Sequence, residues 1–128
     1  MAETARNPAY IAPVLRVANI ARSIAFYRDQ LGFNVDFVHE GFYASVSRQG
    51  CRLHLKCAPP IPRDQAGLER EEHIDACVVG PGIAALAAQF TSAGVALLVP
   101  LRRMAYGTEF YVRDPDGYVL GFIQPEAE

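Results

Sequence analysis

The chain has 128 residues, of which 51% are hydrophobic, and a formal net charge of −2 at pH 7. It is long enough to bury one core without disulfides or a structural metal, and it has neither a one-sided basic run for nucleic acid nor eighteen consecutive apolar residues for a membrane span. The opening MAETARNPAY has no apolar signal region. We expect a single soluble, cytoplasmic domain over residues 1–128, with no nucleic-acid or membrane partner.

The first half of the chain predicts a β-α-β-β-β module over about residues 11–57. A short apolar strand covers residues 11–17, and Asn19 is suited to cap an amphipathic helix that follows and ends at Gly32. The buried face of this helix is predicted to carry Ile20, Ile24, Tyr27 and Leu31. Three further strands, separated by short glycine-containing turns, are predicted over residues 33–39, 42–48 and 51–57.

The second half repeats this order with a period of roughly 60 residues. A proline-rich linker over about residues 58–72 leads into a second module over about residues 73–124, which begins with a strand at 73–79 and a helix at 82–94. After a strand at 95–99 and a proline-containing loop, a hairpin closes on an Asp-Pro-Asp-Gly turn, and its strands cover residues 108–114 and 118–124. The predicted fold class is α+β, with two βαβββ modules that each have to bury a sheet face.

The segment GCRLHLKC alternates with the period of a β-strand. Its pattern places Leu53 and Leu55 on one face. The opposite, polar face carries Arg52, His54 and Lys56. A metal site, a ligand-binding cavity and plain solvent would each suit that polar face. The cysteines of the chain lack CxxC spacing, and we expect them to be reduced, inward-facing small hydrophobes. They are Cys51, Cys57 and Cys77.

Two strings, VANIARSIAFYRDQLGF in the first module and RDPDGYVLGF in the second, form a specific combination. Together they resemble the vicinal oxygen chelate superfamily, which includes glyoxalases, extradiol dioxygenases, fosfomycin-resistance enzymes and bleomycin-resistance proteins. The resemblance covers the chain from about Pro13 to Gln124. It implies that the two modules form curved mixed sheets around a cleft, as in the glyoxalase/bleomycin-resistance fold, and that a homodimer completes the clefts.

Metal-using members of this superfamily hold their metal at four equivalent points. The resemblance places these points on Ala12, His54, His73 and Gly121. Alanine and glycine supply no donor atom, and a catalytic metal normally has three or more protein ligands. We therefore predict no metal and no other cofactor. The alternative is a divalent metal such as zinc, nickel, manganese or iron, held weakly by His54 and His73.

Within the superfamily, the segments LGFNVDFVHEGFYASV and AYGTEFYVRDPDGY are most similar to the bleomycin-resistance type, which binds a drug without converting it. The resemblance implies a groove lined by aromatic side chains, and aromatic rings stack well on heteroaromatic ligands. Arg52 and Lys56 favour an anionic or acceptor-rich ligand. The predicted ligand-binding residues are Phe37, Phe42, Tyr43, Arg52, His54, His73, Tyr106 and Glu109.

The sequence thus predicts a metal-independent small-molecule-binding protein, with an aromatic antibiotic as one candidate ligand and no catalytic residue. The alternative function is that of a metal-dependent glyoxalase-like lyase or isomerase, or of an enzyme similar to the extradiol dioxygenases, with Glu109 as an additional ligand or base. An interaction module that does not use its cleft is a third reading. Gly80-Pro81-Gly82 is interpreted as a strand-to-helix turn rather than a dinucleotide fingerprint, and Asp114 and Asp116 as turn residues rather than an acid/base pair.

Overall fold

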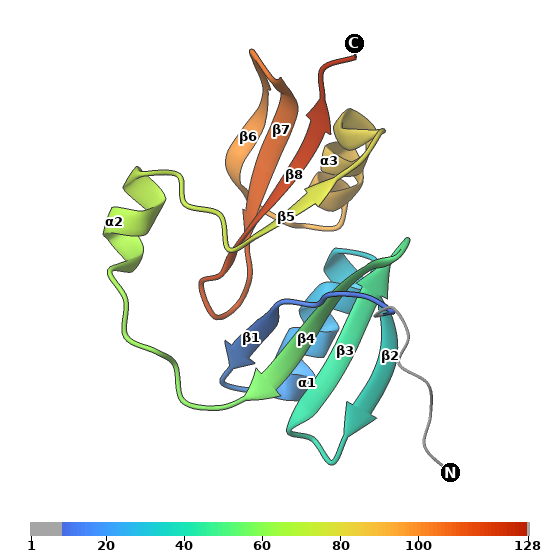
Figure 1. Cartoon of the computed structure of the whole chain (residues 1–128), viewed down its shortest axis with the longest axis vertical. Helices are drawn as coiled ribbons and strands as arrows, with labels where there is room; N and C mark the ends of the chain where they lie inside the picture. Colours follow the sequence, from blue (N-terminus) through green and yellow to red (C-terminus); the bar gives the residue numbers. More distant parts are fainter. Residues whose placement is uncertain (1–8, 128) are drawn as a thin grey trace.

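The computed structural model describes residues 9–127, which form two four-stranded mixed sheets (Figure 1). The first sheet has the order β1-β4-β3-β2 and consists of β1 (Val14–Val17), β2 (Asn34–His39), β3 (Tyr43–Arg48) and β4 (Cys51–Cys57). The second has the order β5-β8-β7-β6 and consists of β5 (Ala76–Val79), β6 (Leu97–Met104), β7 (Gly107–Arg113) and β8 (Val119–Pro125). β1 and β5 run parallel to β4 and β8, whereas the other pairs are antiparallel. The α+β class and its two βαβββ modules are confirmed. Residues 1–8 and residue 128, which the predicted domain includes, lie outside the described residues.

The first module is covered by α1 (Ile20–Ala25), which continues into a π-helical turn, η1 (Phe26–Gln30). The Asn19 side chain accepts a hydrogen bond from the Arg22 backbone N–H and so caps the helix as predicted. The predicted helix was regular, but Leu31 N–H donates to Phe26 O, five residues back. The wider turn keeps Tyr27 and Leu31 fully buried against the sheet. The predicted helical face is confirmed.

In the second module, α3 (Ile83–Ser92) covers the corresponding sheet face. It begins after Gly82, which has a φ of 74°. The prediction that Gly80-Pro81-Gly82 forms a strand-to-helix turn is therefore confirmed. Phe90 of α3 packs edge-on against Phe110 and Phe122, whose rings stack on each other with centroids 4.9 Å apart. These aromatic contacts join helix and sheet into one core.

One predicted loop was wrong, and the linker contains a helix that was not predicted. The linker contains a short helix, α2 (Gln65–Arg70), capped by the Asp64 side chain. β6 continues through Pro100 instead of ending in a loop, because a register shift between Val99 and Arg102 accommodates a residue that cannot donate a ladder hydrogen bond.

The prediction that the cysteines face inward was also wrong. Cys57 and Cys77 are exposed, and Cys51 is partly exposed. Cys57 ends its strand, and Cys77 lies between Ala76 and Val78, which pack against the core, so its side chain is on the uncovered face of the second sheet. The thiols are free in this structure.

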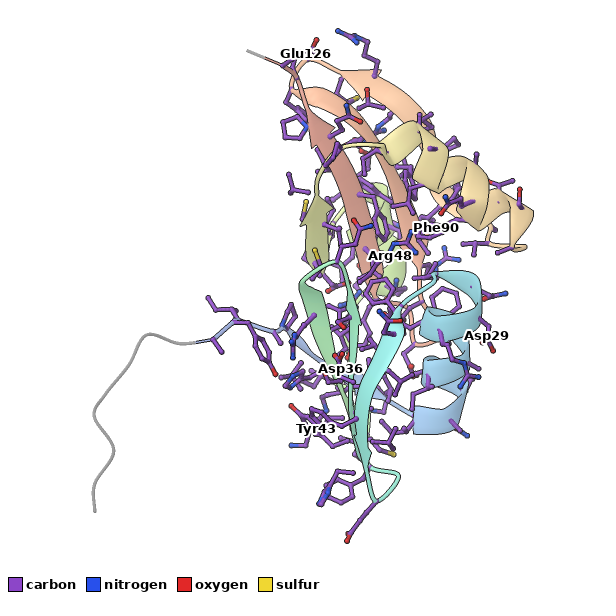
Figure 2. The ribbon with its side chains drawn as sticks, turned by 90° about the vertical axis from the view of Figure 1, so that its right-hand side faces the viewer. Asp29, Asp36, Tyr43, Arg48, Phe90 and Glu126 are labelled. Atoms are coloured by element: carbon purple, nitrogen blue, oxygen red, sulfur yellow. The ribbon has the colours of Figure 1, made fainter. Side chains whose placement is uncertain are left out.

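The two sheets follow each other along the long axis of the molecule, with α1 and α3 on the same side (Figure 2). The turn between β7 and β8 joins the modules. Asp116 in this turn accepts hydrogen bonds from Ala18 N–H at 2.9 Å and from Arg22 at 3.0 Å, and Asp114 accepts one from the Tyr27 hydroxyl at 2.8 Å. The prediction that Asp114 and Asp116 are turn residues is confirmed. Their side chains also attach the second module to α1 and its N-terminus.

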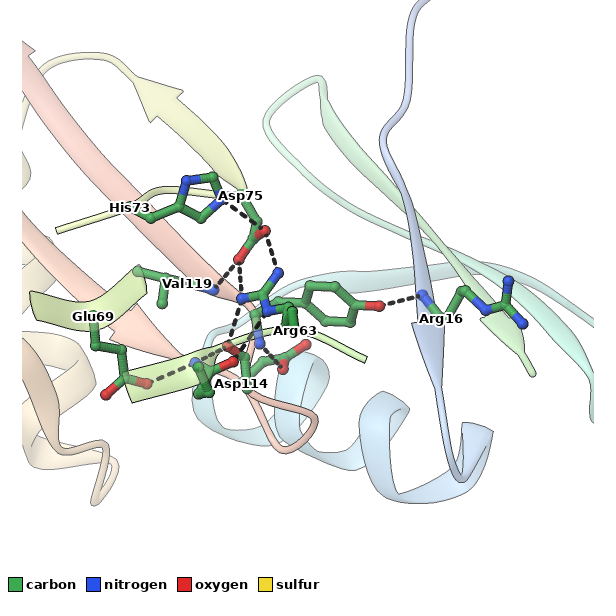
Figure 3. Close-up of polar contacts among 10 residues, drawn as sticks. Arg16, Arg63, Glu69, His73, Asp75, Asp114 and Val119 are labelled. Carbon is green, nitrogen blue, oxygen red and sulfur yellow. Dashed lines mark hydrogen bonds and ion pairs between the residues drawn. The ribbon is translucent and has the colours of Figure 1, made fainter. Parts of the chain in front are cut away.

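A second set of polar contacts lies where the two modules and the linker meet. Arg63 forms a bidentate ion pair with Asp75, at 2.8 and 2.9 Å, and the Tyr118 hydroxyl accepts a hydrogen bond from Arg16 N–H at 3.0 Å (Figure 3). Within residues 9–127, no helix has both the length and the apolar character that crossing a bilayer requires.

Candidate functional site

A cluster of aromatic and polar side chains lies on the face of the first sheet that α1 leaves uncovered. Leu53 and Leu55 are buried beneath α1, so His54 between them points to the other face. The hydroxyl of Tyr43 on β3 is 2.9 Å from His54 Nδ1. Phe37 on β2 stacks parallel to Tyr43 with centroids 6.4 Å apart and meets the His54 ring edge-on at 5.9 Å. We call Phe37, Tyr43 and His54 the aromatic cluster.

Charged and hydroxyl groups lie beside the aromatic cluster. Asp36 accepts hydrogen bonds from Ser45 at 2.8 Å and from Ser47 at 2.7 Å. The bond from Ser47 is the largest cause that lowers the pKa of Asp36, and the nearby positive charge of Arg52 lowers it further. The site therefore combines flat apolar rings with an imidazole, a guanidinium and an ionised carboxylate.

The uncovered face of the second sheet holds a buried carboxylate, Glu109. Its side chain is fully buried, although it points away from the core residues Phe110 and Val112. It accepts hydrogen bonds from the Tyr106 hydroxyl at 2.6 Å and from Arg102 Nε at 2.8 Å. The hydrogen bond to Glu109 is the main reason why the pKa of Tyr106 rises to about 12. Glu109 is thus placed to hold Tyr106 and Arg102.

The structure brings four of the eight predicted ligand-binding residues together on the first sheet. They are Phe37, Tyr43, Arg52 and His54. Tyr106 and Glu109 contact each other on the second sheet. Phe42 packs instead against His39 at the end of the β2–β3 hairpin, with ring centroids 5.1 Å apart.

The remaining predicted residue, His73, lies between α2 and β5, where its Nε2 is 3.2 Å from Asp75 Oδ1, beside Arg63 (Figure 3). Sequence reasoning missed Arg102, which lies in what was predicted as a loop, and Tyr10, which precedes the first strand. No periodic pattern could have pointed to either residue.

Two of the four points at which the resemblance places metal ligands carry a donor side chain. Ala12 and Gly121 carry no donor atom, and both ring nitrogens of His54 lie within hydrogen-bond distance of tyrosine hydroxyls. Across residues 9–127, no three His, Cys, Asp or Glu side chains come together in a group that could hold a metal ion. A side chain at Gly121 would also meet Ile74, whose Cδ1 is 2.8 Å from the position of an added Cβ. Ile74 thus fills the space that a side chain at position 121 would occupy.

A scan against protein-family models matches residues 9–122 to the Glyoxalase/Bleomycin resistance protein/Dioxygenase superfamily. A comparison with curated proteins found no match. Among solved structures, the bleomycin-binding protein from bleomycin-producing Streptomyces verticillus, complexed with copper(II)-bleomycin, is 26% identical with a TM-score of 0.71, and the match covers 95% of this chain and 100% of that one.

Two further solved structures show likeness of fold alone. The glyoxalase/bleomycin resistance protein/dioxygenase from Alicyclobacillus acidocaldarius is 14% identical with a TM-score of 0.72, and the match covers 96% of each chain. Lactoylglutathione lyase from Agrobacterium tumefaciens is 19% identical with a TM-score of 0.66, and the match covers 93% of this chain and 96% of that one.

Proposed function

Because the chain belongs to the glyoxalase/bleomycin resistance protein/dioxygenase superfamily, we propose that it is a metal-independent small-molecule-binding protein of the bleomycin-resistance type. It holds an aromatic compound, such as an antibiotic, in the cytoplasm and does not convert it. The observation that carries this proposal is the aromatic cluster of Phe37, Tyr43 and His54 on an uncovered sheet face.

The aromatic cluster has the properties of a binding surface. Phe37 is 43% exposed, although a phenylalanine on a sheet is normally buried. Its ring is oriented by Tyr43 and His54, so that a flat ligand meets a surface that is already ordered. Small-molecule sites typically combine such apolar walls with a few polar groups that fix the orientation of the ligand, and here His54 and Arg52 would supply them.

A homodimer would supply the second wall of the groove. The uncovered faces of both sheets carry large hydrophobic side chains that are about half exposed, namely Phe37 at 43%, Tyr106 at 50% and Val79 at 57%. We expect these side chains to be covered when two copies of the chain associate. Sedimentation equilibrium should give twice the mass of the chain.

The bleomycin-binding protein, 26% identical over most of the chain, supports the class of ligand. Isothermal titration calorimetry with copper(II)-bleomycin and with metal-free bleomycin tests the binding function. Saturable binding is expected, and mass spectrometry should recover the compound unchanged. Tyr106→Ala should weaken binding about two- to tenfold, the value of one aromatic contact. His54→Ala should weaken it as well, whereas His39→Ala is the matched control, because His39 is exposed at the hairpin end and contacts only Phe42 among the aromatic side chains of residues 9–127. Equal affinities in all variants, or a converted product, would contradict the proposal.

Metal content gives an independent test. Protein purified without a histidine tag or chelators should contain no stoichiometric zinc, nickel, manganese or iron by plasma mass spectrometry. Near-stoichiometric metal that is lost in both His54→Ala and His73→Ala would instead support an enzyme of the metal-dependent type, with ligands from two chains.

A further inference from the structure

The N-terminal segment places an aromatic side chain of the protein itself on the proposed site. The Tyr10 hydroxyl is 3.2 Å from His54 Nε2, and the two rings meet edge-on with centroids 5.9 Å apart. The Arg52 guanidinium carbon lies 4.3 Å from the centroid of the Tyr10 ring, well within the range of a cation–π contact. Three side chains thus form one small arrangement in which a phenol is held by an imidazole and a guanidinium.

The arrangement that receives Tyr10 does not depend on Tyr10. The second ring nitrogen of His54, Nδ1, is 2.9 Å from the Tyr43 hydroxyl, and Phe37 contacts the same ring. Each ring nitrogen of His54 thus lies within hydrogen-bond distance of a tyrosine hydroxyl. The position of Nε2 is fixed by neighbours on β2 and β3, which hold the His54 ring.

Tyr10 itself is held by side-chain contacts. Residues 9–13 belong to no helix or strand, and Ile11 beside Tyr10 is 92% exposed. The stretch first joins the sheet through its backbone at Pro13, whose carbonyl accepts a hydrogen bond from His54 N–H at 2.9 Å. Tyr10 also remains 42% exposed. Its ring can therefore leave the site by rotation of a short exposed segment, without breaking the hydrogen bonds of a strand.

We propose that Tyr10 is a tethered placeholder, and that the ligand of this site is a planar hydroxyaryl compound. The inference rests on the proposed binding function and adds the chemical class of the ligand. A hydroxyaryl ring takes the place of the Tyr10 ring against Arg52, and its oxygen takes the place of the phenol oxygen at His54 Nε2. An alkyl chain would gain neither the contact with the guanidinium nor the hydrogen bond.

The placeholder also predicts the direction in which Tyr10 affects binding. A ligand competes with the tethered ring, so its apparent affinity is reduced by the fraction of molecules in which the site is open. If Tyr10 occupies the site in most molecules, its removal strengthens binding by roughly five- to tenfold. A residue that merely formed one wall of the site would have the opposite effect, because its removal would weaken binding.

The test measures binding of 2-naphthol, a fluorescent hydroxyaryl probe, and of 2-methoxynaphthalene, which lacks the hydroxyl donor, to the full chain. Tyr10→Ala should bind 2-naphthol about five- to tenfold more tightly than the wild type. Ile11→Ala, the matched control in the same segment, should bind as the wild type does. In the Tyr10→Ala background, His54→Ala should abolish the preference for 2-naphthol over 2-methoxynaphthalene.

The outcomes separate this inference from the function on which it rests. Unchanged or weaker binding of 2-naphthol by Tyr10→Ala, in a protein that still binds bleomycin, would overturn the placeholder and leave the proposed function standing. Absence of binding of every probe by every variant, bleomycin included, would overturn both. Circular dichroism of each variant verifies that it is folded, and a 19F label on the Tyr10 ring of the otherwise intact protein should change its chemical shift when 2-naphthol binds.

Discussion

Replacing Asp114 by asparagine tests how the two modules are joined. The side chain is 3% exposed, and burial raises the pKa of its carboxyl to about 6. An asparagine of the same shape keeps the contacts, because its carbonyl oxygen can accept from the backbone N–H groups of Asp116 and Tyr118, as Asp114 Oδ1 does at 2.9 and 3.0 Å. Its amide group can then donate to the Tyr27 hydroxyl, which donates to the carboxylate in the native chain. The substitution therefore removes a buried charge, and it also removes the acceptor of the Tyr27 O–H, a cost that does not change between pH 4 and pH 7.5.

The expected magnitude follows from the two pKa values of this carboxyl. A folded value of about 6, against 3.8 for an ordinary aspartate, makes the ionised form less favourable in the folded chain by about 3 kcal/mol. Because the folded pKa is the higher one, the folded chain takes up the proton first as the pH falls. The contribution of Asp114 to the free energy of unfolding therefore rises by about 2 kcal/mol between pH 7 and pH 4, and the rest of the roughly 3 kcal/mol is gained below pH 4.

Urea unfolding at several values between pH 4 and pH 7.5 measures this effect. Other groups titrate in this range, so the quantity of interest is the difference in free energy of unfolding between Asp114→Asn and the wild type. This difference should shift in favour of the variant by about 2 kcal/mol from pH 4 to pH 7.5, because only the wild type carries the buried charge at the higher pH. Asp29→Asn is a control of opposite sign. Its free energy of unfolding should fall below that of the wild type at neutral pH, because the hydrogen bond from Arg28 lowers the pKa of Asp29. A difference between Asp114→Asn and the wild type that does not change with pH would refute the reasoning.

Two further predictions concern single side chains on the uncovered face of the second sheet and at the end of β4. Glu109→Gln should lower the pKa of the Tyr106 phenol from about 12 towards its ordinary value of 10.0, because the carboxylate that raises it becomes neutral. Ultraviolet titration, with the curve of Tyr106→Phe subtracted, isolates this one tyrosine. An unchanged pKa would show that Glu109 is not the cause of the shift. Cys57 should react with a disulfide reagent faster than Cys77, because burial raises the pKa of the Cys77 thiol and leaves less thiolate at pH 8; equal rates in single-cysteine variants would contradict this ordering.

Much of the fold could be predicted from local patterns. The period-two alternation of GCRLHLKC placed Leu53 and Leu55 in the core, and the helical spacing from Ile20 to Leu31 identified the buried face of α1. Both patterns exist because a regular element repeats its direction every few residues. The errors occurred where that regularity is broken. The bulge at Pro100 and the capped turn of α2 each depend on a single local interaction.

The candidate site could be predicted only in part, and for a physical reason. Since the sequence indicates which face of a strand a side chain occupies, His54 and Arg52 could be placed together, and the likeness of two segments to a known superfamily added Tyr43 and Tyr106. Phe42 failed to join this group because it lies at a hairpin end, where the direction of the chain changes.

Local sequence patterns were enough to predict the two repeated modules and the helix that covers each of them, and the residue types at Ala12 and Gly121 show that these positions lack donor atoms. The contact between Tyr10 and His54, 44 residues apart in the chain, and the contacts of Arg102 and Tyr106 with Glu109 became visible in the folded chain. The modules and helices could be predicted because they depend on the spacing and chemistry of residues that are close in the sequence. The contacts of Tyr10 and Glu109 depend on strand register and on the packing of distant segments. Many weak interactions set that packing, and they produce no periodic pattern in the sequence.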